Sequence, residues 1–305
     1  MTSETLWKRQ YKLHFPDLGF SFDNIDDEAE GLKISFKIDK DISQESNKSE
    51  LKIWNLKAET REKIEKADTK LEIYAGYKDT GGPVKIYTGS VLISETKDEG
   101  KDVVTELKLG DGADSLRDAV VSLSFPPDTD GRRIADTIAG EMGLTISYAK
   151  DVQMESFKNG FSHAGYAKDA MTTVCNAFGC DWSIQNGIIQ VIMAGGTFAD
   201  RGIVFSPESG LVGSPHRINQ AKPSEDKENS KGKKKRQSKK TRPEKKAGWE
   251  ISTLLAPSVN PGDAVKVESR MIKGWFRVES ISHAGDSYGG GQWESKIQLI
   301  EGLGT

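Results

Sequence analysis

The sequence has few of the features that mark a secreted or membrane-spanning protein. Its 305 residues include only two cysteines, Cys175 and Cys180, so no disulfide framework is predicted and the expected place of synthesis is a reducing cytoplasm. No apolar run approaches the roughly 20 residues that cross a bilayer. The N-terminal residues MTSETLWKRQ contain no apolar signal core. We therefore expect no membrane insertion.

Motifs for catalysis or metal binding are also missing. The four histidines are far apart, and the spacing of Cys175 and Cys180 is not that of a zinc knuckle. The segment 128–131 resembles the start of an EF-hand loop, but the twelfth position, which requires Glu, is Ala139. No GxSxG motif or phosphate loop is present, and none of the 46 acidic residues lies in a recognisable glycosidase context. The sequence predicts no enzyme, no cofactor and no metal site.

Charge is divided unevenly along the chain. Residues 222–246 contain twelve Lys or Arg and four Asp or Glu, a net charge of +8. The other 280 residues contain 31 basic and 42 acidic side chains, a net charge of −11. The overall net charge of −3 therefore describes neither part, and an acidic body carries one strongly basic segment.

The basic segment permits two interpretations. It has no aromatic or apolar anchor, as a solvated loop between two strands would have. The same charges could contact nucleic acid or an acidic protein surface, in a manner that is non-specific and weakened by salt. The candidate contact residues are Lys233, Lys234, Lys235, Arg236, Lys239, Lys240 and Arg242.

Residues 6–109 mostly alternate apolar and polar side chains, which is typical of half-buried strands. The segment 49–64, SELKIWNLKAETREKI, is predicted to be a strand that ends at Trp54-Asn55-Leu56 and a short helix that begins at Glu59-Thr60. We predict a hairpin loop over Lys97–Lys101. About six short strands with one helix indicate a closed or nearly closed antiparallel barrel. The predicted strands are Lys12–Phe15, Lys33–Ile38, Leu51–Trp54, Lys70–Tyr77, Lys85–Ile93 and Val103–Leu109.

The middle of the chain has a different pattern. A strand is predicted at Val120–Phe125, and Thr129 or Asp130 could cap a helix over Arg132–Met142. A second helix over Ala167–Phe178 is followed by a hairpin whose turn is Gln185-Asn186-Gly187. After Gly202 strands return. They are predicted at Gly210–Pro215, His216–Asn219, Trp249–Leu255, Val265–Glu268, Gly274–His283 and Trp293–Ile300, with a loop at Asp286–Gly291.

Four segments, in this order, carry a resemblance to one family. They are the strand and helix of 49–64, the link GDGADSLRDAVVSLSF at 110–125, the helix and hairpin of 166–192, and the phrase LLAPSVNPGDAVKVES at 254–269. This order resembles the baseplate hub proteins of contractile-tailed phages, whose relatives form the base of type VI secretion and tailocin spikes.

The resemblance implies a fold and a role. The fold would be mainly β with an α+β insertion: a first tail-tube-like barrel at 1–110, a small α/β middle domain at 111–200, and a second barrel at 201–305 that carries the basic loop 222–246. Such hubs are homotrimers whose six barrels form a pseudo-hexameric ring. The expected partners are the tail tube or tube-adaptor proteins above, the spike below, the wedge proteins, the tape-measure protein and passing DNA, in a virion assembled in the host cytoplasm.

The same resemblance makes the segment 49–64 testable. Ile53, Leu56 and Ile64 are expected to be buried where the helix packs on the barrel, with Trp54 on the opposite strand face, near a neighbouring chain or the adjoining module. Three alternatives stay open: a nucleic-acid-binding protein that uses 222–246, a tail-associated hydrolase, and a tail-tube or tube-initiator protein, which would have one barrel. The basic loop is expected to project outward or downward, toward wedge or spike proteins.

Overall fold

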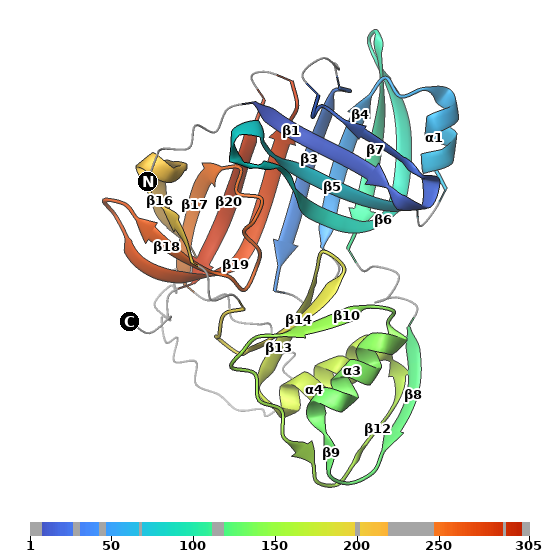
Figure 1. The fold of residues 1–305 in the computed structure, drawn as a ribbon, viewed down its shortest axis with the longest axis vertical. Helices are drawn as coiled ribbons and strands as arrows, with labels where there is room; N and C mark the ends of the chain where they lie inside the picture. Colours follow the sequence, from blue (N-terminus) through green and yellow to red (C-terminus); the bar gives the residue numbers. More distant parts are fainter. Residues whose placement is uncertain are drawn as a thin grey trace, which may run out of the picture.

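Figure 1 shows the computed structural model, which describes residues 8–26, 31–42, 47–66, 69–111, 119–198, 202–218, 247–288 and 291–300. These residues form a broad β-sheet, in the upper half of the view, and a smaller α/β module below it. The predicted fold class, mainly β with an inserted α/β module, is confirmed. The seven candidate basic residues of segment 222–246 lie outside the described residues.

Strands from both ends of the chain share one 13-stranded sheet, in the order β16-β17-β20-β19-β3-β4-β7-β6-β5-β1-β2, with β18 pairing β19 and β15 pairing β18. The N-terminal strands are β1 (Arg9–Phe15), β2 (Phe20–Asp23), β3 (Ile34–Asp41), β4 (Lys48–Trp54), β5 (Lys70–Tyr77), β6 (Gly82–Glu99) and β7 (Asp102–Gly110). The C-terminal strands are β15 (Ile203–Phe205), β16 (Leu211–Ile218), β17 (Gly248–Leu254), β18 (Ala264–Glu268), β19 (Lys273–Asp286) and β20 (Trp293–Ile300).

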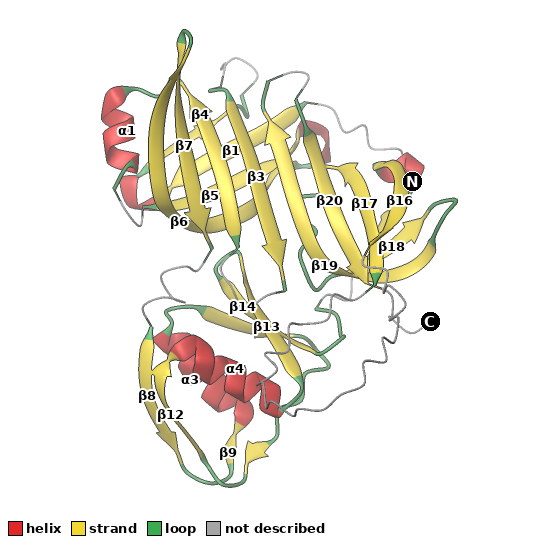
Figure 2. Ribbon diagram, turned by 180° about the vertical axis from the view of Figure 1, so that it is seen from behind, coloured by secondary structure: helices red, strands yellow, loops and turns green. Residues whose placement is uncertain are grey.

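The two β regions are joined by the antiparallel pairing of β3 with β19, which we call the seam. It pairs Ser35–Asp41 with Ser280–Asp286, positions about 245 residues apart in the chain. Figure 2 shows these two strands side by side in the middle of the sheet. The sequence analysis predicted both strands but not their pairing, because strand periodicity contains no information about a distant partner.

Alternation along the strands separates a polar face of the sheet from a core-facing one. On β3, Ile34, Phe36 and Ile38 are buried while Lys37 and Asp41 are exposed. Buried side chains of this kind form two hydrophobic clusters, one under each β region. Each large apolar side chain contributes about 1.5–3 kcal/mol relative to an exposed one, so the clusters hold the curved sheet together.

The turn between β4 and the next helix is formed by one asparagine. Asn55 has a φ of 57°, a left-handed conformation that asparagine tolerates better than most residues. Its side chain accepts a hydrogen bond from Val103 N at 3.0 Å and donates one to Asp102 Oδ1 at 2.9 Å. The chain thus turns away from the sheet and enters helix α1 (Ala58–Ile64), one residue before the predicted start.

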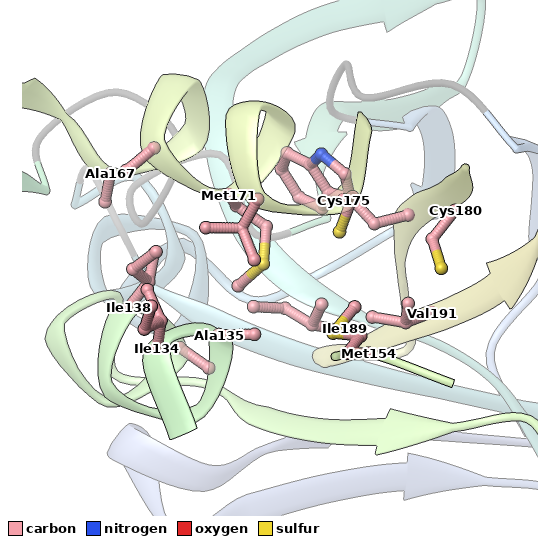
Figure 3. Close-up of a cluster of buried hydrophobic side chains, with 14 of the residues drawn as sticks. Ile134, Ala135, Ile138, Met154, Ala167, Met171, Cys175, Cys180, Ile189 and Val191 are labelled. Atoms are coloured by element: carbon pink, nitrogen blue, oxygen red, sulfur yellow. The ribbon is translucent and has the colours of Figure 1, made fainter. Parts of the chain in front are cut away.

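The α/β module contains helices α3 (Gly131–Glu141) and α4 (Ala167–Ala177), close to the predicted ranges. Asp130, one of the two proposed caps, accepts hydrogen bonds from Arg132 N and Arg133 N, an arrangement worth about 1 kcal/mol. Figure 3 shows Met171 and Cys175 of α4 pointing into the core that also contains Ile134 and Ile138 of α3. The strands are β8 (Val120–Phe125), β9 (Thr129–Asp130), β10 (Thr145–Tyr148), β11 (Ser156–Phe157), β12 (Phe161–Tyr166), β13 (Cys180–Gln185) and β14 (Ile188–Met193).

Some local predictions need correction. The hairpin loop predicted over Lys97–Lys101 is much shorter, since β6 continues to Glu99 and β7 begins at Asp102. Both faces of this hairpin end are exposed, so charged residues occupy both. The sequence there lacks the apolar–polar alternation from which a strand is predicted. The two strands predicted over 210–219 are one bulged strand, β16. Strand β10 was not predicted at all, and it pairs in parallel with β14.

The described helices are all too short or too polar to cross a membrane. No group of three or more potential metal ligands occurs in the part of the chain that the structure describes. Both cysteines are free and buried, and burial raises the pKa of the Cys175 thiol to about 12.

Candidate assembly interface

A polar groove runs along the face of the sheet over the seam, with a volume of about 840 Å³. It is lined by residues of β4, β3, β19, β20 and β17. The groove is hollow at β19 because this strand contributes Ser280, Ser282 and Ala284 between longer side chains on its neighbours. Ser282 Oγ donates a hydrogen bond to Asp39 at 2.5 Å, next to the Lys37–Asp39 ion pair of 3.2 Å.

The charges in this groove are mixed. Five lysines and six carboxylates line it, and Phe36 is its single aromatic residue. Exposed ion pairs such as Lys37–Asp39 are worth about 0.2–1 kcal/mol each, so they do little for stability. The groove therefore lacks both the excess of cations and the aromatic stacking platform by which proteins bind polyanions tightly.

Below the groove, a buried polar cluster joins the three parts of the chain. Its members come from β3, the residue before β4, the residue after β7, the β13–β14 turn and the loop before β18. Three of them are buried and three are half-buried: Lys40, Asn47 and Asp111, and Asn186, Asn260 and Asp263. Figure 1 shows the β13–β14 hairpin of the α/β module reaching the lower end of β3.

Lys40 is the centre of this cluster. Its Nζ donates to Asn186 Oδ1 at 2.7 Å and to Asn260 Oδ1 at 3.0 Å. Asp111 accepts from the backbone N of Asn186 at 3.0 Å and of Gly187 at 3.2 Å, which holds the hairpin turn. The α/β module is therefore attached to both β regions through one turn.

Two further side chains extend this attachment. Asn47 Nδ2 donates to the backbone oxygen of Ile184 at 3.1 Å, and Gln185 Nε2 donates to that of Asp41 at 2.7 Å. These hydrogen bonds link the strand before the turn to the segment between β3 and β4. Each buried hydrogen bond contributes about 0.5–1.5 kcal/mol, but leaving one partner unpaired costs more.

Burial shifts the titration of the charged members. It lowers the pKa of Lys40 to about 8, although the negative charges of Asp111 and Asp263 oppose this shift. It raises the pKa of the Asp111 carboxyl and of the Asp263 carboxyl to about 6 each. At neutral pH Lys40 is therefore a buried cation near the buried carboxylate of Asp111 and the half-buried carboxylate of Asp263. Loss of one partner would leave an uncompensated buried charge.

His283 lies on the buried face of β19 near this cluster. Its Nδ1 lies 2.8 Å from Ser295 Oγ, and burial together with the charge of Lys40 lowers its pKa to about 3. This histidine is neutral at physiological pH. It is a core residue, and no other histidine lies in the cluster.

The sequence analysis did not single out Lys40. A signal for it exists, because Ile34, Phe36, Ile38 and Lys40 occupy successive core-facing positions of one strand. A lysine at the fourth such position indicates either the end of the strand or a buried charge with partners. The identity of those partners depends on segments distant in the chain, so only the tertiary structure supplies them.

The helix-packing residues proposed from the sequence lie in one place. Ile53 and Ile64 are fully buried and Leu56 is 6% exposed, all in the hydrophobic cluster of the first β region. Trp54 is half-buried on the other face of β4, with Lys33 Nζ 4.3 Å from its ring centroid. None of these four residues lines the groove or is a member of the buried polar cluster.

The two β regions repeat one strand order. The order β3-β4-β7-β6-β5-β1 in the first corresponds to β16-β17-β20-β19-β18-β15 in the second. We call these sets the first unit and the second unit. The last pair differs, since β1 and β5 are antiparallel whereas β15 and β18 are parallel. The long strands β6 and β19 each have a register shift, at Val91/Ile93 and at Val278/Ser280.

Backbone hydrogen bonds outside the ladders repeat as well. Three such hydrogen bonds within the first unit each have an equivalent within the second, and all six are 2.8–3.0 Å long. Trp54 N donates to Lys33 O, and the equivalent bond in the second unit is Leu254 N to Gly210 O. Asn55 N donates to Val103 O, and its equivalent is Leu255 N to Trp293 O. Val91 N donates to Thr69 O, and its equivalent is Val278 N to Asp263 O. The two units are therefore structural repeats, although their sequences show no clear repeat.

The architecture is that of phage tail proteins. A tail protein from Neisseria meningitidis superposes with a TM-score of 0.64 at 12% identity, covering 97% of both chains. The 43 kDa tail protein of prophage MuSo2 from Shewanella oneidensis gives 0.64 at 13% identity, covering 96% of this chain and 98% of that one.

A component of the type VI secretion system has the same fold. The E. coli c3393 protein, described as structurally similar to the T4 tail proteins gp27 and gp5, superposes with a TM-score of 0.58 at 9% identity. The match covers 95% of this chain and 76% of that one.

Residues 18–216 match the family described as baseplate hub gp41, and the chain belongs to this family. The predicted resemblance to baseplate hub proteins is thus confirmed. The family is a structural one, and the protein is a component of a phage tail. No curated protein sequence matches the chain.

Proposed function

We propose that the protein is the hub ring of a contractile-tail baseplate, a homotrimer that joins a six-fold tail tube to a three-fold spike. The observation that carries the proposal is the repeat of one strand order on both sides of the seam. Each chain contributes two equivalent units joined edge to edge. Three chains joined head to tail in the same manner would place six units in a closed ring.

The α/β module supports the step from six-fold to three-fold symmetry. It is inserted after β7 of the first unit and is held beneath the seam by Asp111 and Lys40. In a ring of three chains, such a module would occur under every second junction between units. The upper surface would then have six similar units and the lower surface three modules, which is the geometry that a tube and a spike require.

The groove is proposed to face the channel. Its five lysines and six carboxylates nearly cancel, and its hollow centre is formed by small side chains of β19. Such a wall would not retain DNA, because binding to duplex DNA depends on an excess of phosphate-neutralising cations. The tape-measure protein and DNA are therefore proposed as transient contents.

The remaining assignments follow from this role. The spike is proposed to contact the α/β modules, the tube or tube-adaptor proteins the opposite end, and wedge proteins the outside. We retain the division into two barrels at 1–110 and 201–305 and a middle domain at 111–200 as part of the proposal. The protein would act in the virion after assembly in the host cytoplasm, with no catalytic step of its own.

The test is the mass and symmetry of the purified particle, by light scattering and electron microscopy. We expect a mass of three chains and a ring whose class averages show six similar units on one side and three on the other. A stable dimer would overturn the proposal. A ring with six identical modules below would overturn the account of the symmetry change.

A further inference from the structure

Two of the open strand edges in the described part of the chain match each other. The second half of β6, Ile93–Glu99, pairs with β7 on one side only, and β16 pairs only with β17. Open edges expose rows of backbone donors and acceptors that readily pair with another strand. Both edges belong to the sheet that carries the groove.

Structural equivalence links these two edges. Strand β6 corresponds to β19 and strand β16 corresponds to β3, by the strand order of the two units. The second half of β19 pairs on both sides, with β20 and, at the seam, with β3. The edge of β6 thus lacks the partner that its counterpart has, and β16 is the strand equivalent to that partner.

The register follows from the ladders within each unit. Superposing the bulges of β6 and β19 places Glu95, Thr96 and Lys97 on Ser282, His283 and Ala284. Superposing the β16–β17 ladder on the β3–β4 ladder places His216, Arg217 and Ile218 on Lys37, Ile38 and Asp39. At the seam the corresponding pairs are Ser282 with Asp39, His283 with Ile38, and Ala284 with Lys37.

We propose that the Ile93–Glu99 edge of β6 pairs antiparallel with β16 of the next copy of this chain, with Glu95 opposite Ile218, Thr96 opposite Arg217 and Lys97 opposite His216. This inference rests on the proposed ring and specifies how the ring closes. The contact between chains repeats the contact within a chain, so one geometry serves all six junctions.

The charges of the two edges favour a second copy of this chain as the partner of the β6 edge. The β6 edge carries Glu95, Asp98 and Glu99, and β16 carries Arg217 and His216. Lys97 and His216, which would be opposite each other, are each already paired with carboxylates of their own unit. Lys97 lies 2.9 Å from Glu106 and 3.1 Å from Glu95, and His216 lies 3.0 Å from Glu250.

Apolar exposure also marks these edges. Ile93 is 46% exposed and Val212 is 40% exposed, whereas the equivalent seam positions, Ser280 and Ser35, are half-buried serines. Pro215 lies in the bulge of β16 and cannot donate a backbone hydrogen bond, so the pairing is assigned to His216–Ile218.

Disulfide trapping tests the register. A chain with Lys97→Cys and His216→Cys is expected to form intermolecular disulfides under mild oxidation, because directly opposed residues have Cα separations within the range that a disulfide spans. On a non-reducing gel most of the protein should move to bands of two and three chains, and reductant should return it to one chain. The native Cys175 and Cys180 are buried and should not react.

Two variants serve as matched controls. Lys37→Cys with Ala284→Cys is the equivalent pair at the seam and should cross-link within a single chain. Glu95→Cys with Val212→Cys is out of register and should not cross-link. Particle mass is measured for every variant before oxidation.

The outcomes separate this inference from the proposed function. A trimeric ring with the expected cross-link supports both. A trimeric ring that cross-links no better at 97 and 216 than at 95 and 212 overturns the strand pairing and leaves the ring intact. A particle that is not a trimer overturns the ring and the pairing together.

Discussion

The first and second units have the same strand order and different connections. Between β4 and β5 the first unit has helix α1, whereas the second has only a loop between β17 and β18. The first unit buries Lys40 and Asp111 and continues into the α/β module, and the second unit has no such insertion in the described residues. Shared strands hold the sheet together, and the connections make the two units different.

The basic segment is one of these differences. It lies between β16 and β17, and the equivalent connection of the first unit runs from Asp41 to Lys48, at the end of the sheet where the α/β module attaches. By this equivalence, β16 ends and β17 begins at the module side of the sheet.

The largest expected effect comes from the charged partners that only the first unit has. Asp111→Ala should lower the free energy of unfolding by about 3–5 kcal/mol, because Lys40 would lose a buried counter-ion and the β13–β14 turn would lose its acceptor. Urea unfolding measures this change. The exposed Asp39→Ala is the control and should stay within about 0.5 kcal/mol. Equal costs for the two variants would show that the cluster does not hold the module.

Equivalent core positions should respond differently. Ile53 and Thr253 occupy the same place in the two units, and both are fully buried. Ile53→Ala should cost about 2–5 kcal/mol, because it leaves a cavity beneath α1. Thr253→Ala should cost about 1 kcal/mol through its hydrogen bond to Ser295 O. Thermal unfolding monitored by circular dichroism compares them. A larger cost at Thr253 than at Ile53 would contradict this expectation.

A smaller effect depends on pH. Burial raises the pKa of Asp263 to about 6 from an ordinary value of 3.8, so its contribution favours the folded state fully below the ordinary value and is lost as pH rises through about 6. The contribution is at most about 3 kcal/mol. Asp263→Asn should therefore flatten the decline in unfolding free energy between pH 4 and 7. An unchanged slope, measured by urea unfolding at several pH values, would contradict this.

The smallest effect is expected from deletion of 222–246. The strands on either side pair with each other without it, so the particle mass and symmetry should not change. Light scattering tests this. A parallel filter-binding assay with duplex DNA at low and moderate salt tests the alternative role. A strong, salt-sensitive affinity that the deletion abolishes would favour the nucleic-acid-binding interpretation.

Local features of the fold were predictable from the residues. The Asp130 cap, helix α4 and the Asn186-Gly187 turn depend on neighbours in the chain, and each was placed within a few residues. The order of four segments along the chain was the basis of the family resemblance. The strands of the β6–β7 hairpin were predicted too short, because a segment with charged residues on both faces has the composition of a loop when its partner strand is not known.

The sequence by itself determined the three described α-helices and most of the long strands, that the body is acidic with one basic segment, and that no recognised catalytic motif is present. Alternation and capping are local, so they can be read along the chain. Only the tertiary structure decided that β3 pairs with β19, that Lys40 is buried among Asn186, Asn260 and Asp111, and that the two units repeat. Backbone hydrogen bonds are alike for every strand pair, so the choice of distant partners depends on how the whole core packs.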